Sequence, residues 1–125
     1  MTEDERLVTE LVEGWVSAIV ARDLEGVVAG HASDVVMFDV PPPDDGVRGL
    51  AAYRETWPPF FKFLESGAVF ELDRLEVTAG AEVAYAHALL RCGNPPNRLR
   101  VTVGLRQEDG RWVIAHEHHS FPLAD

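Results

Sequence analysis

Cysteine is almost absent from this 125-residue chain, which contains only Cys92. A single cysteine cannot form an intrachain disulfide, so a reducing compartment is expected. The first residues, Met1 to Glu5, are acidic, and no apolar run of membrane-spanning length follows them. We therefore expect a cytoplasmic protein without a signal peptide or a transmembrane segment.

Positive charge is also scarce, with 11 Lys and Arg against 21 Asp and Glu and a formal net charge of -10. A chain this acidic repels the phosphates of nucleic acids and the head groups of anionic lipids. The chain also lacks a phosphate-binding loop, a dinucleotide fingerprint and a nucleophile elbow. We expect no nucleic-acid partner, no membrane partner and no cofactor.

The composition that remains is typical of an ordinary globular protein, with 46% hydrophobic and 26% charged residues. A chain of this length can bury a core without disulfides or metals. No repeat or low-complexity segment divides it, so we expect one domain spanning residues 1–125.

The first part of the chain predicts two helices. Thr2 followed by Glu5 is the signature of a capping box, and apolar residues then recur at helical spacing over residues 7–19. Asp23 can cap a second, shorter helix, and Gly30 can end it.

Residues 33–40 are rich in β-branched side chains and predict a strand with Val35, Met37 and Asp39 on one face. After a proline-rich loop, residues 49–65 predict a helix that breaks after Trp57, because two prolines follow. The remaining pattern alternates and predicts four strands, at residues 68–77, 82–92, 98–106 and 111–120.

This order of elements indicates an α+β fold. The strands do not alternate regularly with helices, which argues against a parallel doubly wound sheet. We expect a strongly bent, mostly antiparallel sheet that wraps three helices of the N-terminal half around a pocket.

The last strand contains His116, Glu117, His118 and His119, and its two faces carry different chemistry. A turn at Asp109-Gly110 predicts that Val103 lies near Ala115 and Val101 near Glu117. The apolar row of the preceding strand would then share the inner face with Val113, Ala115, Glu117 and His119. A bulge would reverse the facing beyond the bulged residue.

His116 and His118 have the spacing that can place two imidazoles on one metal ion. No third ligand follows from the sequence, so we expect no metal site and place both residues on the outer face, where they could meet another subunit.

Four stretches resemble the NTF2-like superfamily, and within it the SnoaL-like and ketosteroid-isomerase-like proteins. They are residues 15–26, 33–39, 46–49 and 109–120, and the last is also similar to the end of the calmodulin-dependent kinase association domain. The resemblance covers nearly the whole chain. It implies a cone-shaped curved sheet, a deep and mostly apolar pocket, and a homodimer.

The resemblance also implies roles for single residues. Steroid isomerases of this superfamily use an aspartate base at the end of the first strand, where Asp39 stands. Their oxyanion hole uses a tyrosine, which Trp15 replaces, and a protonated aspartate, for which Val103 is the nearest match. Steroid isomerisation itself is therefore not expected, since such groups typically contribute about 3–4 kcal/mol each. The same matching places Tyr85, His87, Leu89, Arg91 and His119 on pocket-facing positions.

Each candidate residue has a structural alternative. Asp39 is either a general base or a cap of the proline loop, and His87 is either its proton-transfer partner or a buried histidine that stabilises the fold. Arg91 is either an anchor for an anion or a solvated residue. Glu117 and His119 form either an acid/base set or an internal ion pair with an arginine. The expected pocket lining comprises Trp15, Met37, Tyr53, Trp57, Tyr85, Arg91, Val101, Val103 and Glu117.

Two function hypotheses follow. In the first, the protein is a cofactor-independent isomerase, cyclase or dehydratase that acts on a hydrophobic or polyketide-like substrate, with Asp39 as base and His87 or His119 as partner acid. In the second, the same fold is a non-catalytic module that binds a small acid through Arg91 and His119, or that only dimerises.

Overall fold

The structure is a computed structural model that describes residues 1–124. Its helices are α1 (Glu3–Val20), α2 (Leu24–Val28), α3 (Leu50–Glu55) and α4 (Trp57–Glu65). Its strands are β1 (His31–Phe38), β2 (Val47–Arg48), β3 (Val69–Ala79), β4 (Val83–Gly93), β5 (Pro96–Glu108) and β6 (Arg111–Ser120). They form one sheet in the order β2-β1-β6-β5-β4-β3, in which only β1 and β6 run parallel.

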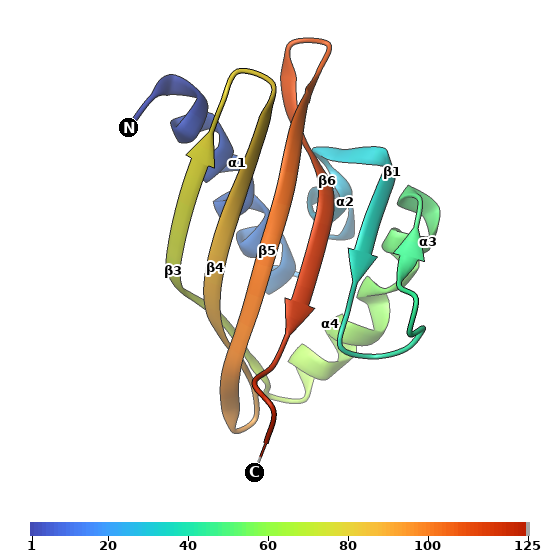
Figure 1. Ribbon diagram of the computed structural model, residues 1–125. Helices are drawn as coiled ribbons and strands as arrows, with labels where there is room; N and C mark the ends of the chain where they lie inside the picture. Colours follow the sequence, from blue (N-terminus) through green and yellow to red (C-terminus); the bar gives the residue numbers. More distant parts are fainter. Residues whose placement is uncertain (125) are drawn as a thin grey trace.

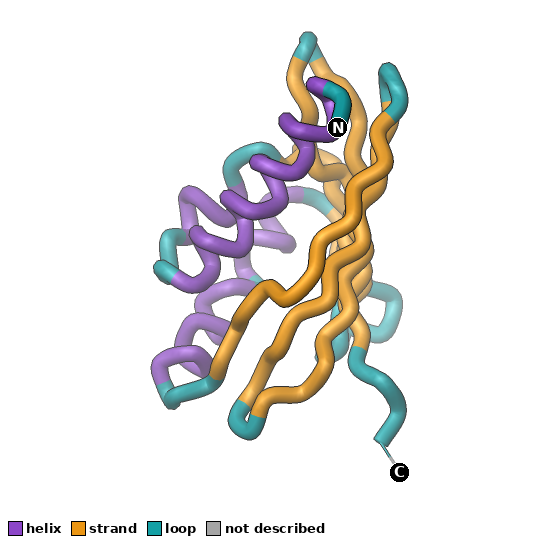
Figure 2. Tube along the Cα trace, turned by 90° about the vertical axis from the view of Figure 1, so that its left-hand side faces the viewer, coloured by secondary structure: helices purple, strands orange, loops and turns teal. Residues whose placement is uncertain are grey.

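The sheet is curled, and all the helices lie on one of its faces (Figures 1 and 2). The other face is open to solvent. The expected α+β architecture is therefore confirmed. The core lies between the inner sheet face and the helices, as in other two-layer folds.

Helix α1 begins as the sequence predicts. The Thr2 side chain accepts a hydrogen bond from the amide of Glu5, and the Glu5 side chain accepts one from the amide of Thr2. One stripe of the helix is buried against the sheet and α2, namely Val8, Val12, Trp15, Val16, Ala18 and Ile19. The stripe and the cap together explain why an 18-residue helix forms here.

The helix expected over residues 49–65 is two helices, α3 and α4, which meet at Thr56. The break lies before Trp57, one residue earlier than expected. Pro58 and Pro59 fall in the first turn of α4, where a missing amide hydrogen costs nothing, so the prolines begin a helix rather than end one.

The β5–β6 hairpin differs from the expected register. Leu105 pairs with Ile114, whereas Gly104 pairs with His116, so Ala115 is bulged out between the two pairs. Before the bulge Trp112 and Ile114 are buried, and after it Glu117 is buried. The expectation that Val113 and Ala115 face inward is wrong, but Glu117 and His119 still share the inner face, because Val103 pairs with Glu117 and Val101 with His119.

The expectation that Tyr85, His87 and Arg91 face a pocket is also wrong, since all three are exposed on the outer face of β4. The buried residues of this strand are its small ones, Ala84, Ala86 and Ala88, followed by Leu90 and Cys92. The small side chains of this row leave room for the bulky side chains of the helix layer, and the period of two turns the larger polar side chains outward.

No helix within residues 1–124 is both long enough and apolar enough to cross a lipid bilayer.

We predict that Val12→Ala lowers the free energy of unfolding by about 2 kcal/mol, because it removes two buried methyl groups and leaves a cavity. Val12 is fully buried, whereas Val20 on the same helix is 45% exposed. Urea denaturation followed by tryptophan fluorescence measures both variants. Val20→Ala is the matched control and should change stability by less than about 0.5 kcal/mol; equal losses in the two variants would contradict this helix orientation.

Candidate functional site

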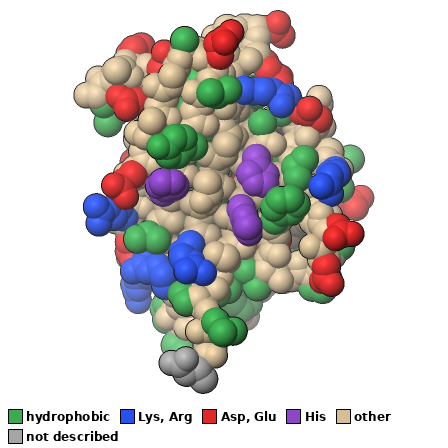
Figure 3. All heavy atoms as spheres, viewed as in Figure 1, with side chains coloured by type: hydrophobic (Ala, Val, Ile, Leu, Met, Phe, Trp, Pro, Cys, Tyr) green, Lys and Arg blue, Asp and Glu red, His purple; other side chains and the backbone are tan. Residues whose placement is uncertain are grey.

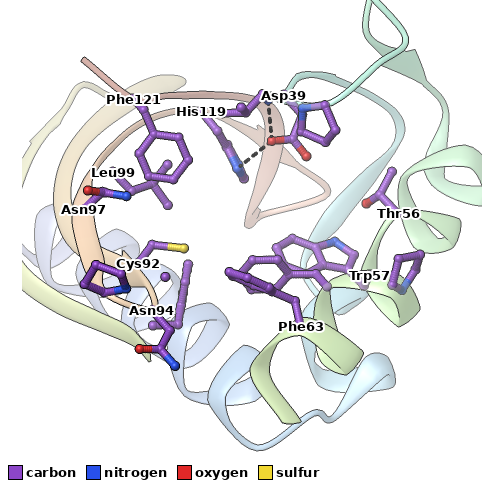
Figure 4. A pocket seen from close by; sticks show the side chains of 17 residues that line it. Asp39, Thr56, Trp57, Phe63, Cys92, Asn94, Asn97, Leu99, His119 and Phe121 are labelled. Atoms are coloured by element: carbon purple, nitrogen blue, oxygen red, sulfur yellow. Dashed lines mark hydrogen bonds and ion pairs between the residues drawn. The ribbon is translucent and has the colours of Figure 1, made fainter. Parts of the chain in front are cut away.

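A cavity of about 520 Å³ lies between α4, the end of β1 and the β4–β5 connection. Its size is that of a pocket for a ligand of a few rings. Most of its wall is aromatic or aliphatic, and its polar side chains are few (Figure 4). The apolar wall includes Trp57, Phe60, Phe63, Phe70, Leu99 and Phe121, and the polar side chains are Asp39, Thr56, Asn94, Asn97 and His119.

Asp39 and His119 point into this cavity from the same side, opposite the indole of Trp57 (Figure 4). The parallel register of β1 and β6 explains their meeting. Met37 pairs with Glu117 and Phe38 with His118, so the next step places Asp39 beside His119. His119 Nδ1 lies 3.5 Å from Asp39 Oδ1, which is close enough for an ion pair but longer than a hydrogen bond.

Asp39 stands where β1 ends and the proline loop begins. Its Oδ1 accepts a 2.7 Å hydrogen bond from the amide of Val40, and its side chain is 29% exposed. Among residues 1–124, no group donates to its Oδ2. One carboxylate oxygen is therefore held in place and the other is available to a ligand. A second hollow, of about 400 Å³ and lined by the proline loop and Met37, also borders Asp39.

Glu117 lies behind His119 and is fully buried. Its Oε1 is 2.9 Å from His119 Nε2, while its Oε2 is 2.5 Å from His31 Nε2 and accepts a 2.6 Å bond from the Tyr53 hydroxyl. The Tyr53 hydroxyl in turn accepts a 3.0 Å bond from Trp15 Nε1. We refer to Trp15, His31, Tyr53, Glu117 and His119 as the buried polar network.

The electrostatics of this network follow from burial and charge. Burial alone would raise the pKa of Glu117, but hydrogen bonds and positive charge from His119 and His31 outweigh it and lower the pKa to about 2. Burial would lower the pKa of His119, yet the bond to Glu117 and the charges of Glu117 and Asp39 raise it above its ordinary value. Glu117 is thus a carboxylate, and His119 holds its proton more tightly than a free histidine.

Two other groups at the cavity have unusual surroundings. Burial, helped by the charge of Asp39, raises the pKa of the Cys92 thiol to about 11, so Cys92 is a neutral lining group and not a nucleophile. The Trp57 indole nitrogen is buried and makes no hydrogen bond to any group in residues 1–124, although it lies near enough to the Tyr53 hydroxyl to influence its pKa.

The structure brings three of the expected site residues to the cavity: Asp39, His119 and Trp57. Other expected lining residues are fully or almost fully buried in the core and do not line it; these are Trp15, Met37, Tyr53, Val101, Val103 and Glu117. Their inward facing is as expected. Trp15 and Tyr53 lie on α1 and α3, and the helix layer covers the sheet face that carries the other four residues. Tyr85, His87 and Arg91 lie on the opposite face of the sheet, and Arg91 pairs there with Glu71.

Sequence reasoning missed His31, Asn94 in the β4–β5 loop and Asn97 at the start of β5. The strand was expected to begin at Ser33, which left His31 outside any predicted element. Its importance arises from the pairing of β1 with β6, two strands separated by most of the chain. No local pattern contains that information.

Comparison with known proteins agrees with this architecture. The family profile of the SnoaL-like domain matches residues 8–124. An NTF2-like protein of unknown function from Pseudomonas putida KT2440 is similar in sequence and structure, with 35% identity, a TM-score of 0.91, and coverage of 99% of this chain and 90% of that one. No curated protein matches the chain in sequence.

More distant structures share the fold alone. A proposed ketosteroid isomerase from Shewanella frigidimarina NCIMB 400 has 20% identity and a TM-score of 0.76, covering 89% of this chain and 92% of that one. A proposed dehydratase of the NTF2-like family from Streptomyces avermitilis has 17% identity and a TM-score of 0.79, covering 97% of both chains.

The low pKa of Glu117 predicts acid sensitivity. A carboxylate whose pKa falls on folding contributes stability above its ordinary pKa of 4.5 and loses that contribution as the pH falls toward about 2. The free energy of unfolding should therefore fall between pH 5 and pH 3, and should fall less in Glu117→Gln. Urea denaturation at both pH values measures this.

The matched control for that experiment is Glu25→Gln, which removes an exposed carboxylate paired with Arg54. Solvent screens this pair, so the variant should keep most of the wild-type dependence on pH. Identical curves for Glu117→Gln and the wild type would contradict an ionised Glu117.

Proposed function

The chain belongs to the family of SnoaL-like domains within the NTF2-like superfamily, and we propose that it is a cofactor-independent enzyme that moves protons on a hydrophobic or polyketide-like ligand. Asp39 is the general base and His119 is its partner acid. The reaction types that this pair can perform are isomerisation, aldol-type cyclisation and dehydration.

One observation carries the proposal: a carboxylate and an imidazole meet at one end of an apolar cavity, 3.5 Å apart. Apolar surroundings strengthen electrostatic interactions and keep out competing water. Pairs of titratable groups in a cavity are typical of acid/base sites. Separations between catalytic groups are often long without ligand and shorten when a ligand binds.

The chemistry begins with a proton on a carbon next to a carbonyl group. Asp39 takes the proton, and the electron pair of the broken C–H bond moves to the carbonyl oxygen to form an enolate. In an isomerisation Asp39 returns the proton to another carbon. In a dehydration His119 Nδ1–H protonates a hydroxyl group that leaves as water while the new C=C bond forms. In a cyclisation the enolate carbon attacks a second carbonyl of the ligand, and His119 protonates the resulting alkoxide.

The lining favours a neutral ligand over an acid. Within residues 1–124 no lysine or arginine lines the cavity, and Arg91, the expected anchor for an anion, lies on the other face of the sheet. The charge of His119 is already balanced by Glu117 and Asp39. The Asn94 and Asn97 side chains offer neutral donors and acceptors to oxygen atoms of such a ligand.

We predict that Asp39→Asn lowers the rate of proton removal by at least about 100-fold, because general base catalysis contributes roughly this much or more. A suitable probe is 2-tetralone, a neutral bicyclic ketone with acidic C–H groups, incubated in D2O. Mass spectrometry then measures deuterium incorporation. Asp45→Asn, in the same loop but with an exposed side chain, is the matched control and should keep the wild-type rate.

The outcome for the wild type separates the two function hypotheses. If the Asp39→Asn variant still incorporates deuterium as fast as the wild type and faster than buffer alone, Asp39 is not the general base. Binding of neutral ketones across a panel without any exchange would favour the alternative, a non-catalytic ligand-binding module. The buried Trp15 and Val103, which stand where steroid isomerases have oxyanion donors, are the observation that favours this alternative.

We also propose a homodimer formed through the outer face of the sheet. Histidine and hydrophobic side chains gather on that face (Figure 3). Tyr85 is 47% exposed and stacks near His87, while Phe38 packs edge-on against His116 and His118. The uncharged Thr102 and Gly104 lie between these groups in the sheet, and interface centres are typically rich in aromatic side chains and poor in acidic ones.

Analytical ultracentrifugation tests the homodimer. The wild type should sediment as a dimer at micromolar concentration, and Tyr85→Glu should shift it toward monomer because a charge would be buried without a partner. Leu7→Glu places the same charge on a partly exposed position of α1 and should leave the dimer intact. A monomeric wild type would refute the proposal.

A cytoplasmic location is proposed as well. Its support is the free thiol of Cys92, since a chain without disulfides suits a reducing compartment.

A further inference from the structure

Glu117 is the most deeply buried charged side chain near the cavity, and the proposed chemistry does not use it directly. It is fully buried and does not line the cavity, so it cannot touch a ligand. Burying a carboxylate is costly unless every oxygen is paired. Its position directly behind His119 therefore calls for a physical explanation beyond packing.

We propose that Glu117 is a positioning residue that acts through His119: it fixes which ring nitrogen of His119 holds a proton permanently and which one exchanges protons with Asp39 and a ligand. This inference rests on the proposed function for its catalytic meaning. Its geometric basis is independent of any ligand.

The hydrogen bonds determine the tautomer. An ionised carboxylate only accepts, so His119 Nε2, 2.9 Å from Glu117 Oε1, must donate its proton there. His119 Nδ1 is then the nitrogen that gains and loses the second proton, and it faces Asp39 Oδ1 at the end of the cavity. An imidazole oriented by a buried carboxylate behind it is a general arrangement for acid/base catalysis.

Besides His119, two further side chains hold Glu117 in place. His31 on β1 and Tyr53 on α3 meet its Oε2, and Trp15 on α1 donates to the Tyr53 hydroxyl. The His31 and Tyr53 rings also stack, with centroids 4.5 Å apart. With both oxygens occupied, Glu117 cannot rotate away from His119. The groups that face the His119 ring are thus Glu117, Asp39 and the edge-on indole of Trp15.

The charge of Glu117 has a second effect. It favours the protonated form of His119, which provides an Nδ1–H that can be donated to a ligand oxygen near neutral pH. Without Glu117, burial would lower the pKa of His119 and only the charge of Asp39 would oppose this, so the Nδ1–H donor would be lost at a lower pH. Glu117 would then set the pH range in which the acid step works.

Nitrogen-15 NMR of the ligand-free protein tests this directly, with the His119 signals assigned by their loss in His119→Gln. In the wild type, Nε2 should stay protonated while Nδ1 titrates, with a midpoint above the ordinary value of 6.5. In Glu117→Gln the midpoint should fall by at least about one pH unit, because an opposite charge at this distance shifts a pKa by 1–3 units.

Tyr53→Phe is the matched control, since it removes one partner of Glu117 but leaves the bond between Glu117 and His119. Lost hydrogen bonding makes Glu117 a stronger base, so the His119 midpoint should stay unchanged or rise, even if stability falls. A purely structural role for Glu117 predicts that both variants lose stability and that neither moves the midpoint.

The inference is overturned if His119 loses its proton from Nε2 in the wild type, or if the midpoint is the same in a folded Glu117→Gln. Even if Glu117→Gln does not fold, the wild-type spectrum shows which ring nitrogen of His119 loses its proton, and so tests the inference. Because no ligand is present, failure of the proposed function would leave these signals unaffected. If the proposed function and the positioning role of Glu117 are both correct, the pH profile of deuterium exchange should move to lower pH in Glu117→Gln, while binding of 2-tetralone is retained.

Discussion

The fold has to supply hydrogen-bond partners for one fully buried carboxylate, that of Glu117. A lone charge in the interior would cost several kcal/mol, so partners must reach it from elsewhere in the chain. They come from β1, α3 and β6, and α1 joins through Trp15 and Tyr53. The helix layer is therefore tied to the sheet by directional bonds as well as by apolar packing. The same bonds orient His119 toward the cavity, so the stability and the chemistry of the molecule share one set of contacts.

The sequence allowed the architecture to be predicted because its signals are local. The capping box of α1, the alternation of β5 and the Asp109-Gly110 turn each act over a few residues. The break at Thr56 was placed one residue late because prolines tolerate the first turn of a helix. The bulge at Ala115 could not be placed from the pattern, because residues 112–115 are all apolar and either row of this strand could face inward.

The site was predicted only in part, because some of its residues are brought together by contacts between distant parts of the chain. The facing of Glu117 and His119 followed from the apolar row opposite them, and the placement of Asp39 followed from the family resemblance. The family resemblance placed His87 and Arg91 on the inner face, whereas they face outward; the alternation of alanines with larger residues in this strand does not by itself distinguish the two faces. Packing decides which face of β4 is buried, because the small alanine side chains leave room for the side chains of the helix layer. His31 depends on the parallel pairing of two strands distant in the chain, which no local signal reveals.

The proposed chemistry requires that the aromatic cavity binds a neutral ligand with its reactive carbon at Asp39 and His119. Crystallography of the protein soaked with 2-tetralone tests it most directly. The ketone should lie between Trp57 and His119, with a carbon next to the carbonyl within reach of Asp39 Oδ2. An empty cavity at saturating ketone, or a ketone bound with its carbonyl turned away from Asp39 and His119, would contradict it.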